Sequence, residues 1–364
     1  MKSNYFKGKK VLITGHTGFK GSWLSAWLSE LGASIIGISD KVPTSPAHYD
    51  LVKKFVDKDY RIDVKDSKKI YSLINGHKPS LIFHLAAQPI VIESYNNPLN
   101  TFLTNTIGTA NLLDALRKSN HECVVVMITS DKCYDNIEID TGYKETDRLG
   151  GKDPYSGSKG AAELVIRSYV QSFFINKESN VRVAVGRAGN VIGGGDWASY
   201  RIVPDCVRSW SENKKPEIRS PLSTRPWQHV LEPLSGYLTL AYALSKDKQF
   251  NGEAFNFGPP HNQNHTVKEL VDKITTYWPN SDWIDMSGGN NAHHEAGLLQ
   301  LNCEKALNLL GWKATLNFEE TAEWTAKWYL NYYENGIDKA LDKTIDQIKE
   351  YMDFADQRNS FNKE

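Results

Sequence analysis

The sequence has few cysteines and no net charge. Its 364 residues contain only four cysteines, and none of them has the CxxC spacing typical of metal or redox sites. We therefore expect reduced, mostly structural thiols, as in a cytoplasmic protein. Basic and acidic residues are equal in number, 43 each, which argues against binding to nucleic acid or to an anionic membrane through bulk charge.

Long hydrophobic runs are also missing. The longest apolar runs, such as residues 124–128, are far shorter than the ~20 residues that span a bilayer. The N-terminal segment is polar and leads directly into the apolar run 11–14, with no signal-peptide core before it. These two features predict a protein that neither spans a membrane nor is secreted, and we expect it in the cytoplasm.

Short apolar runs alternate with longer amphipathic stretches in the first half of the chain. The apolar runs predict strands over residues 11–14, 34–38, 81–85, 124–128 and 181–185. The stretches between them predict helices over 22–31, 67–75, 101–119 and 155–175. Strands buried on both faces and separated by helices indicate an α/β fold, a Rossmann-type doubly wound parallel sheet.

The regular alternation ends near Gly189, and the following segments are rich in Pro, Trp and Arg. We expect residues 1–189 to form the Rossmann domain and residues 190–364 to form mainly a smaller C-terminal substrate-binding lobe, from which some segments return to the sheet. Helices are expected near 230–245, 266–277 and 318–334. The polar tail from about Asp353 is expected to fray.

A glycine-rich motif, GHTGFKG at 15–21, links the first expected strand to the first expected helix. Gly15, Gly18 and Gly21 allow a tight turn and let a diphosphate approach the amides at the helix N-terminus. The spacing departs from the general GxGxxG fingerprint, so a plain tight loop is the competing interpretation. The position between strand and helix favours a dinucleotide cofactor. The other expected cofactor contacts in this motif are Thr17, Phe19 and Lys20.

Asp40 ends the second expected strand, where a carboxylate can bond both ribose hydroxyls of a dinucleotide and repel a 2′-phosphate. This favours NAD over NADP, although the adjacent Lys41 weakens the inference because a basic group tolerates that phosphate. Asp63 and Val64 follow the next extended segment and are expected near the adenine. A solvated turn is the alternative interpretation for Asp63.

The segment DPYSGSK at 153–159 predicts the start of a helix, because Asp153 is a favourable N-cap and Pro154 suits the first helical position. Tyr155 and Lys159 are then four residues apart on one face. A nearby ammonium and the helix N-terminus should lower the tyrosine pKa from ~10 towards working pH. Such a tyrosine can take a proton from a sugar hydroxyl while hydride leaves the same carbon.

A second polar segment, TSDK at 129–132, follows the fourth expected strand. Its side chains should emerge at the carboxyl end of that strand, where open α/β sheets bind ligands. Three reactive groups, Ser130, Asp131 and Lys132, favour an active site over an ordinary polar turn.

These motifs together resemble the extended short-chain dehydrogenase/reductase family, in the order GHTGFKG, HLAAQ at 84–88, TSDK and YSGSK. Longer segments, GRAGNVIGGGDW at 186–197 and RPWQHV at 225–230, look like the CDP-glucose 4,6-dehydratases of that family. The resemblance covers almost the whole chain. It implies NAD as cofactor, with further contacts from Leu85, Ala86 and Ala87.

The resemblance also implies a reaction on CDP-glucose in three stages. NAD takes hydride from C4 while Tyr155 takes the hydroxyl proton, supported by Ser130 and Lys159. Water then leaves across C5 and C6, with Asp131 as the acid, and hydride returns to C6. Lys132 occupies the position at which dTDP-glucose dehydratases have a glutamate, the proposed C5 base. A lysine can act so only if its pKa is lowered.

For the nucleotide sugar, the resemblance points to Asn190, Arg201 and Arg225, because guanidinium groups bind a diphosphate bidentately. Arg219 is equally consistent with a diphosphate contact and with a solvated surface cation. Gln88 is a further expected substrate contact. Asn105 matches a structural and relay asparagine of the family, with a buried amide bonded to backbone as the alternative.

No metal site is expected. His293, His294 and Glu295 are adjacent, cannot share a helix face and form no HExxH motif. Related proteins pair through two long helices, which implies a homodimer through 101–119 and 155–175.

Two other functions remain open. One is a dehydratase or epimerase for another nucleotide sugar; the other, disfavoured by Ser130, Tyr155 and Lys159, is a regulator that has lost catalysis. The implied pathway role is the supply of deoxysugars for bacterial surface polysaccharide, such as lipopolysaccharide O-antigen.

Overall fold

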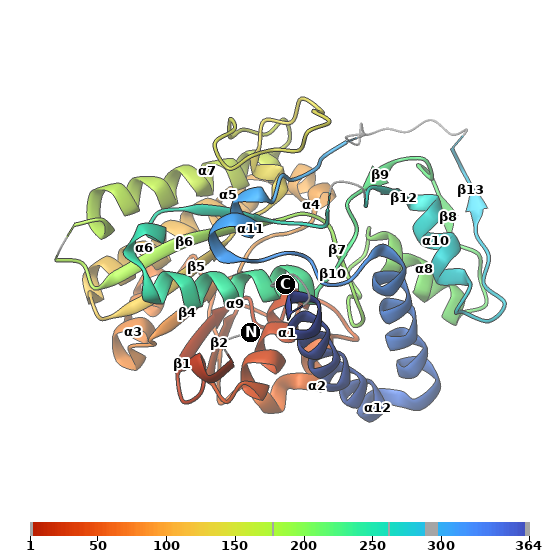
Figure 1. Ribbon diagram of the computed structural model, residues 1–364, viewed down its shortest axis with the longest axis horizontal. Coiled ribbons are helices and arrows are strands. Elements are labelled where there is room, and N and C mark those ends of the chain that lie inside the picture. The colour runs from red at the N-terminus through yellow and green to blue at the C-terminus, as the bar shows by residue number, and fades with distance from the viewer. Residues whose placement is uncertain (1–2, 177, 261–262, 288–297, 361–364) are drawn as a thin grey trace.

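A seven-stranded sheet lies at the centre of the molecule (Figure 1). The computed structural model describes residues 3–176, 178–260, 263–287 and 298–360. The strand order is β11-β6-β5-β4-β1-β2-β3, and every neighbouring pair is parallel. The strands are β1 (Lys10–Thr14), β2 (Ser34–Ser39), β3 (Lys58–Arg61), β4 (Leu81–His84), β5 (Cys123–Ile128), β6 (Val181–Ala188) and β11 (Ala254–Phe257).

Helices cover both faces of this sheet, which confirms the predicted Rossmann-type arrangement (Figure 1). One layer contains α3 (Ser67–His77), α6 (Gly108–Ser119) and α7 (Pro154–Tyr169). The other contains α1 (Phe19–Glu30) and α9 (Leu231–Lys246), and α12 (Phe318–Ser360) packs against α1 and α2. Alternate residues of one strand enter different cores: Val11 and Ile13 pack with the second layer and Leu12 with the first. This explains why the strands appear as continuous apolar runs.

The remaining elements are short. The further helices are α2 (His48–Val52), α4 (Val91–Asn96), α5 (Pro98–Phe102), α8 (Ile202–Ser211), α10 (Val267–Thr275) and α11 (Glu304–Leu310). Small strand pairs are formed by β7 (Val191–Ile192) with β10 (Gln228–His229), β9 (Thr224–Arg225) with β12 (His265–Thr266), and β8 (Glu217–Ile218) with β13 (Ile284–Asp285). The pairs β9–β12 and β8–β13 lie with α8 and α10 to one side of the sheet, at the right of Figure 1. The division at residue 189 stays a prediction.

The helix expected over 101–119 is confirmed as helical throughout, with a π-helical turn, Leu103–Ile107, between α5 and α6. One expectation about the helices was wrong. The tail from Asp353 does not fray within the described residues: α12 continues to Ser360 after a break at Gly336, where φ is +81°. The segment after the break is held because Tyr351 is buried and Arg358 pairs with Glu320 at 2.6 Å.

The strand order reverses between β1 and β4, and this places the glycine-rich loop beside the segment after β4. Strands β2 and β3 follow β1 on one side, and the chain then crosses to β4 on the other. In open parallel sheets a ligand binds at the carboxyl ends of the strands flanking such a reversal. Across the described residues, no helix is both long and apolar enough to cross a membrane.

Candidate active site

The glycine-rich loop needs its glycines for close backbone approach. Gly15 has a φ of +75°, and a Cβ there would lie 2.8 Å from the amide nitrogen of Ala86. A Cβ on Gly21 would lie 2.1 Å from the carbonyl oxygen of Gly15. The loop is therefore tightly folded against the segment after β4, as a binding turn at the strand ends requires.

The N-terminus of α1 follows directly on the glycine-rich loop. Its N-cap, Gly18, offers no side-chain hydrogen bond to the first amides of the helix. These amides fit a diphosphate, since an uncapped helix N-terminus favours an anion. Thr17 fixes the loop to the end of β2 by donating its hydroxyl to the carbonyl oxygen of Lys41 at 2.7 Å. Phe19, the first residue of α1, is half-buried.

The neighbouring strand ends carry the other predicted cofactor residues. Asp40 is exposed directly after β2 and accepts the amide of Lys41 through one carboxylate oxygen. Asp63 accepts the amide of Lys65 at 2.9 Å and pairs with its ammonium, which fits the turn interpretation better than an adenine contact. Val64 is buried. The half-buried segment after β4 contains Leu85, Ala86 and Ala87. All of these remain predicted contacts.

The predicted helix start at Asp153 is confirmed. The Asp153 carboxylate accepts the amide of Ser156 at 2.9 Å and its hydroxyl at 2.6 Å, and Pro154 is the first residue of α7. Tyr155 and Lys159 are both buried on this helix. The local sequence thus places the two predicted reactive groups within the first two turns of α7.

Ser130 and Asp131 follow Thr129 at the end of β5, and both are buried. The Ser130 hydroxyl donates to the Asp131 carboxylate at 2.8 Å, and a hydrogen bond also joins Ser130 to Tyr155. Asp131 is closely packed, since a Cβ on Gly189 would lie 3.0 Å from its other carboxylate oxygen. The strand end and the start of α7 therefore meet at these three side chains.

The pKa of Tyr155 does not follow the sequence expectation. Burial raises it to about 12, and the negative charge of Asp131 acts in the same direction. The hydrogen bond to Ser130 and the positive charge of Arg201 oppose this rise. The sequence predicts that Lys159 lowers the pKa of Tyr155. Burial, however, lowers the pKa of Lys159 itself to about 8, which makes its positive charge easier to lose. Loss of hydration therefore outweighs the favourable charges.

Lys20 and Arg201 add positive charge to the same cluster. Burial, together with the charges of Arg201 and Lys159, lowers the pKa of Lys20 to about 7, and the negative charge of Asp131 opposes this decrease. Arg201 is held by Asp196, whose carboxylate accepts its guanidinium at 2.6 Å. The sequence did not single out Asp196, which follows the glycine run at 193–195.

Lys132 is half-buried beside this cluster, and its amide donates to the Ser130 hydroxyl at 3.2 Å. The fixed position of its backbone is compatible with a role at C5 of a sugar. That role stays a prediction.

The remaining predicted substrate residues are more scattered. The side-chain amide of Gln88 is engaged within the chain, donating to Thr101 at 2.9 Å and accepting from Ile90 at 2.6 Å. Asn190 is half-buried after β6, and Arg219 is exposed. Arg225 is buried in β9 and donates to the carbonyl oxygen of Thr224. Whether these groups bind substrate stays a prediction.

Asn105 is buried in the π-helical turn, and its amide bonds both to the backbone of Gln88 and to Ser158. It thereby connects the segment after β4 with α7. The backbone-bonded alternative fits these contacts, and a relay role is compatible with the bond to Ser158.

A buried ion pair below the site was missed by the sequence analysis. Glu163 on α7 forms a bidentate pair with Arg187 on β6, with both nitrogen–oxygen distances at 2.9 Å. Two signals were available: Glu163 lies one helical turn beyond Lys159, and an arginine within a buried strand needs a partner.

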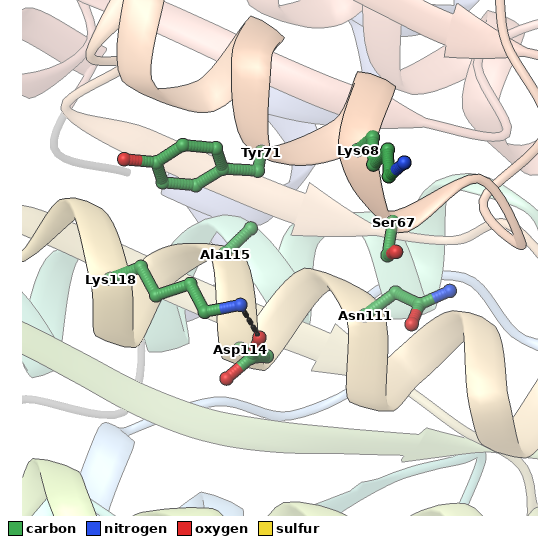
Figure 2. Close-up of a pocket in the computed structure, with 7 residues that line it drawn as sticks. All are labelled: Ser67, Lys68, Tyr71, Asn111, Asp114, Ala115 and Lys118. Carbon is green, nitrogen blue, oxygen red and sulfur yellow. Dashed lines mark ion pairs between the residues drawn. The ribbon is translucent and has the colours of Figure 1, made fainter.

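A shallow cleft lies between α3 and α6, lined by residues that include Tyr71, Asn111 and Lys118 (Figure 2). It contains none of the predicted site residues. Lys118 pairs there with Asp114 at 2.6 Å, and Asn111 donates to backbone carbonyls. These contacts make it a helix–helix surface rather than a second site.

Among the described residues no group of histidine, cysteine, aspartate and glutamate side chains is arranged to hold a metal. His293, His294 and Glu295 lie outside these residues.

Comparison with known proteins agrees with this geometry. Residues 12–325 match the family model described as GDP-mannose 4,6 dehydratase. The CDP-glucose 4,6-dehydratase of Salmonella typhimurium is 46% identical over 323 residues, covering 87% of this chain and 89% of that protein. The CDP-paratose 2-epimerase of Salmonella typhi is 26% identical over 343 residues, covering 85% of this chain and 96% of that protein.

A solved structure of similar fold is the dTDP-glucose 4,6-dehydratase of Bacillus anthracis in complex with NAD. It has a TM-score of 0.73 and 22% identity, covering 90% of this chain and 99% of that chain. The match to the family model and the relative at 46% identity each extend over most of the chain. The chain therefore belongs to the GDP-mannose 4,6 dehydratase family of the extended short-chain dehydrogenases/reductases.

Proposed function

We propose that this chain is a CDP-glucose 4,6-dehydratase, a hydro-lyase that forms CDP-4-dehydro-6-deoxy-glucose. The observation that carries the proposal is the buried Asp131 carboxylate, which accepts the Ser130 hydroxyl at 2.8 Å beside Tyr155. A C4 epimerase needs a base at the C4 hydroxyl but no acid for a C6 leaving group. The 46% identical relative is itself named a CDP-glucose 4,6-dehydratase.

The cofactor of this reaction is NAD, which, when bound, accepts hydride from C4 and returns it to C6. The turn at Gly15 and the uncapped N-terminus of α1 at Gly18 would hold its diphosphate. Asp40 would accept the ribose hydroxyls and disfavour a 2′-phosphate. Lys20 adds a titrating positive charge beside this loop.

In the first step Tyr155 takes the proton of the C4 hydroxyl. With a pKa of about 12, its phenol needs nearby support to give up its own proton. Ser130 is placed for this role by its hydrogen bond to Tyr155, and the Arg201 charge favours the phenolate. We assign the supporting charge to Lys159 as well. Its pKa of about 8 means that the Lys159 ammonium is present at neutral pH and loses its proton as the pH rises above about 8.

In the second step Asp131 donates a proton to the departing C6 hydroxyl and Lys132 takes the C5 proton, which Lys132 returns to C5 when hydride reaches C6. Both residues leave the same strand end, so acid and base can face neighbouring carbons of one sugar ring. Asp131 is buried and Lys132 is half-buried. The ketone formed at C4 makes the C5 proton acidic, which reduces the strength required of the base.

Arg201 and Arg225 are our candidates for the substrate diphosphate, with Asn190, Gln88 and Arg219 as further contacts. Arg201 supports this best, because its positive charge acts on both Tyr155 and Lys20. Its pairing with Asp196 fixes the guanidinium before substrate arrives.

We also propose that the chain forms a homodimer through α5, the π-helical turn and α7. Large apolar side chains on these neighbouring segments are exposed, including Leu99 at 70% and Leu164 at 57%. Exposed apolar side chains on neighbouring segments are typical of a subunit interface. The three buried cysteines suit the reducing cytoplasm, where the product would supply deoxysugars for surface polysaccharide such as O-antigen.

Incubation of the purified protein with CDP-glucose and NAD, followed by mass analysis of the nucleotide sugar, tests the proposed function. We expect loss of one water with no net formation of reduced cofactor. An unchanged mass with a new sugar would indicate an epimerase. No reaction with CDP-glucose, but turnover of a dTDP-, GDP- or UDP-sugar, would contradict the assigned nucleotide.

A further inference from the structure

The ion pair between Glu163 and Arg187 is buried. Each of the two residues also forms hydrogen bonds with other groups. One Glu163 oxygen also accepts the Thr129 hydroxyl at 2.5 Å. The terminal nitrogen of Arg187 that does not contact Glu163, Nη1, donates to the Tyr134 hydroxyl at 2.8 Å and to the carbonyl oxygen of Glu145 at 3.1 Å. A buried pair of this kind is stable only when its remaining donors and acceptors are satisfied in this way.

The two outer partners lie on either side of the proposed catalytic segment. Thr129 directly precedes Ser130, and Tyr134 follows Cys133 after Lys132. The segment from Ser130 to Lys132 is therefore held at both ends by one ion pair. At its far end the Tyr134 hydroxyl donates to Asn256 at 2.8 Å, which fixes that ring to β11.

The same ion pair reaches the other half of the site through α7. Glu163 lies one helical turn beyond Lys159, and its negative charge raises the pKa of Lys159 against the lowering caused by burial. Arg187 comes from β6, the strand that neighbours β5. The ion pair thus connects helix α7, the end of β5 and the Ser130–Lys132 segment.

We propose that Glu163 and Arg187 are positioning residues that hold the Ser130–Lys132 segment in register with Tyr155 and Lys159. The inference rests on the proposed dehydratase function for its kinetic meaning. Positioning matters here because proton transfer depends on the distance between donor and acceptor, and displacement by about 1 Å can cost on the order of 10²-fold in rate. A pair needed only for folding would contribute stability and leave the rate of the folded enzyme unchanged.

Thr129→Val tests this proposal with little change in side-chain shape. It removes the hydroxyl that Thr129 donates to Glu163 and leaves the ion pair between Glu163 and Arg187 intact. We expect kcat to fall about 10-fold or more, with KM for CDP-glucose changed less than about 2-fold. Thr129→Ser restores the hydroxyl and should recover most of kcat. The matched control is Thr325→Val, a buried threonine of α12 whose hydroxyl donates to Thr321, and it should leave kcat unchanged.

Tyr134→Phe releases the other end of the segment and keeps the proposal testable should Thr129→Val fold poorly. It should also lower kcat. Amide hydrogen exchange supplies a readout that needs no substrate: we expect faster exchange in residues 129–134 of both variants, and no such change in Thr325→Val.

Three results would overturn the positioning role: kcat of folded Thr129→Val and Tyr134→Phe equal to wild type, failure of Thr129→Ser to restore kcat, or unchanged exchange in residues 129–134. Wild-type protein that does not dehydrate CDP-glucose would contradict the proposed function instead. The exchange measurement would still decide whether the ion pair holds the segment.

Discussion

Asp131 and Tyr155 are proposed to act at different steps, although they lie within one hydrogen-bonded group with Ser130. Tyr155 is needed for the first proton transfer, at the C4 hydroxyl. Asp131 is needed only when the C6 hydroxyl leaves. Their substitutions should therefore differ in where the reaction stops, which separates the two roles more clearly than a loss of activity alone.

For Asp131→Asn we expect turnover to fall on the order of 10²-fold or more, because the amide cannot donate the proton to the leaving hydroxyl. Oxidation at C4 should continue, so enzyme-bound reduced nicotinamide should accumulate and be visible by its near-ultraviolet absorbance. Tyr155→Phe is the comparison and should show neither product nor reduced cofactor. Equal accumulation in both variants would contradict the division of roles.

His84 is a buried residue whose charge state should affect stability. Thr14 and Thr109 bond its two ring nitrogens, and burial lowers its pKa from 6.5 to about 3, with Lys159 acting in the same direction. Between about pH 3 and pH 6.5, His84 binds a proton in the unfolded chain but not in the folded protein. The free energy of unfolding should therefore decrease as pH falls below about 6.5.

His84→Gln should remove part of this pH dependence. Glutamine does not titrate, so the slope of the free energy of unfolding against pH should fall by up to about 1.4 kcal/mol per pH unit. Urea unfolding of both proteins at several pH values below 6.5 measures the two slopes. Parallel slopes would show that His84 is not neutral when folded.

Among the secondary-structure elements, those with a clear local pattern could be predicted from the sequence. Strands β1, β2, β4, β5 and β6 are rich in buried apolar residues, and each was expected within a few residues of its observed bounds. In contrast, β3 has the sequence KDYR and is mostly exposed at the sheet edge, so it lacks an apolar run. Strand β11 joins β6 by a pairing between distant segments, which no local pattern encodes.

The C-terminal part of α12 shows why polar composition alone misled the prediction. Its surface is charged, yet Tyr351 is buried and donates to the carboxylate of Glu232 at 2.8 Å. Glu232 also accepts backbone amides of Thr315 and Leu316, and burial raises its pKa to about 7. These contacts with residues more than 80 positions away fix the helix.

Tyr351→Phe should therefore destabilise the protein by about 1–3 kcal/mol, because one donor to a buried carboxylate is lost without any change in packing volume. Tyr333→Phe, a ring on the same helix that is 39% exposed, is the control and should change stability by less than about 0.5 kcal/mol. Chemical unfolding measures both. Equal stability of the two variants would mean that the hydroxyl does not anchor the helix.

At the scale of the whole molecule, the proposed homodimer explains why Leu164 on α7 and Leu99 on α5 are exposed. Leu164→Glu places a charge on that face and should convert the dimer to monomer, since burying an unpaired charge at an interface is costly. Light scattering after size exclusion measures the mass. Leu309→Glu is the control: Leu309 is similarly exposed, at 56% against 57%, but lies on α11, and its variant should stay dimeric.

The candidate site was only partly predictable, because its parts come from distant segments. Motifs identified Ser130, Asp131, Tyr155 and Lys159, whose neighbours in sequence define the turn and the helix start. The ion pair between Glu163 and Arg187 was not predicted, because the two side chains come together only when β6 and α7 pack against each other. The Tyr155 pKa was also wrong, since burial depends on the whole fold.

In the proposed function, oxidation at C4, elimination and reduction at C6 all occur in one active site. The most direct test uses CDP-glucose carrying deuterium at C4. We expect a dehydrated product that retains the deuterium at C6, without exchange into added unlabelled cofactor. Deuterium lost to the cofactor pool, or a dehydrated product without deuterium at C6, would contradict it.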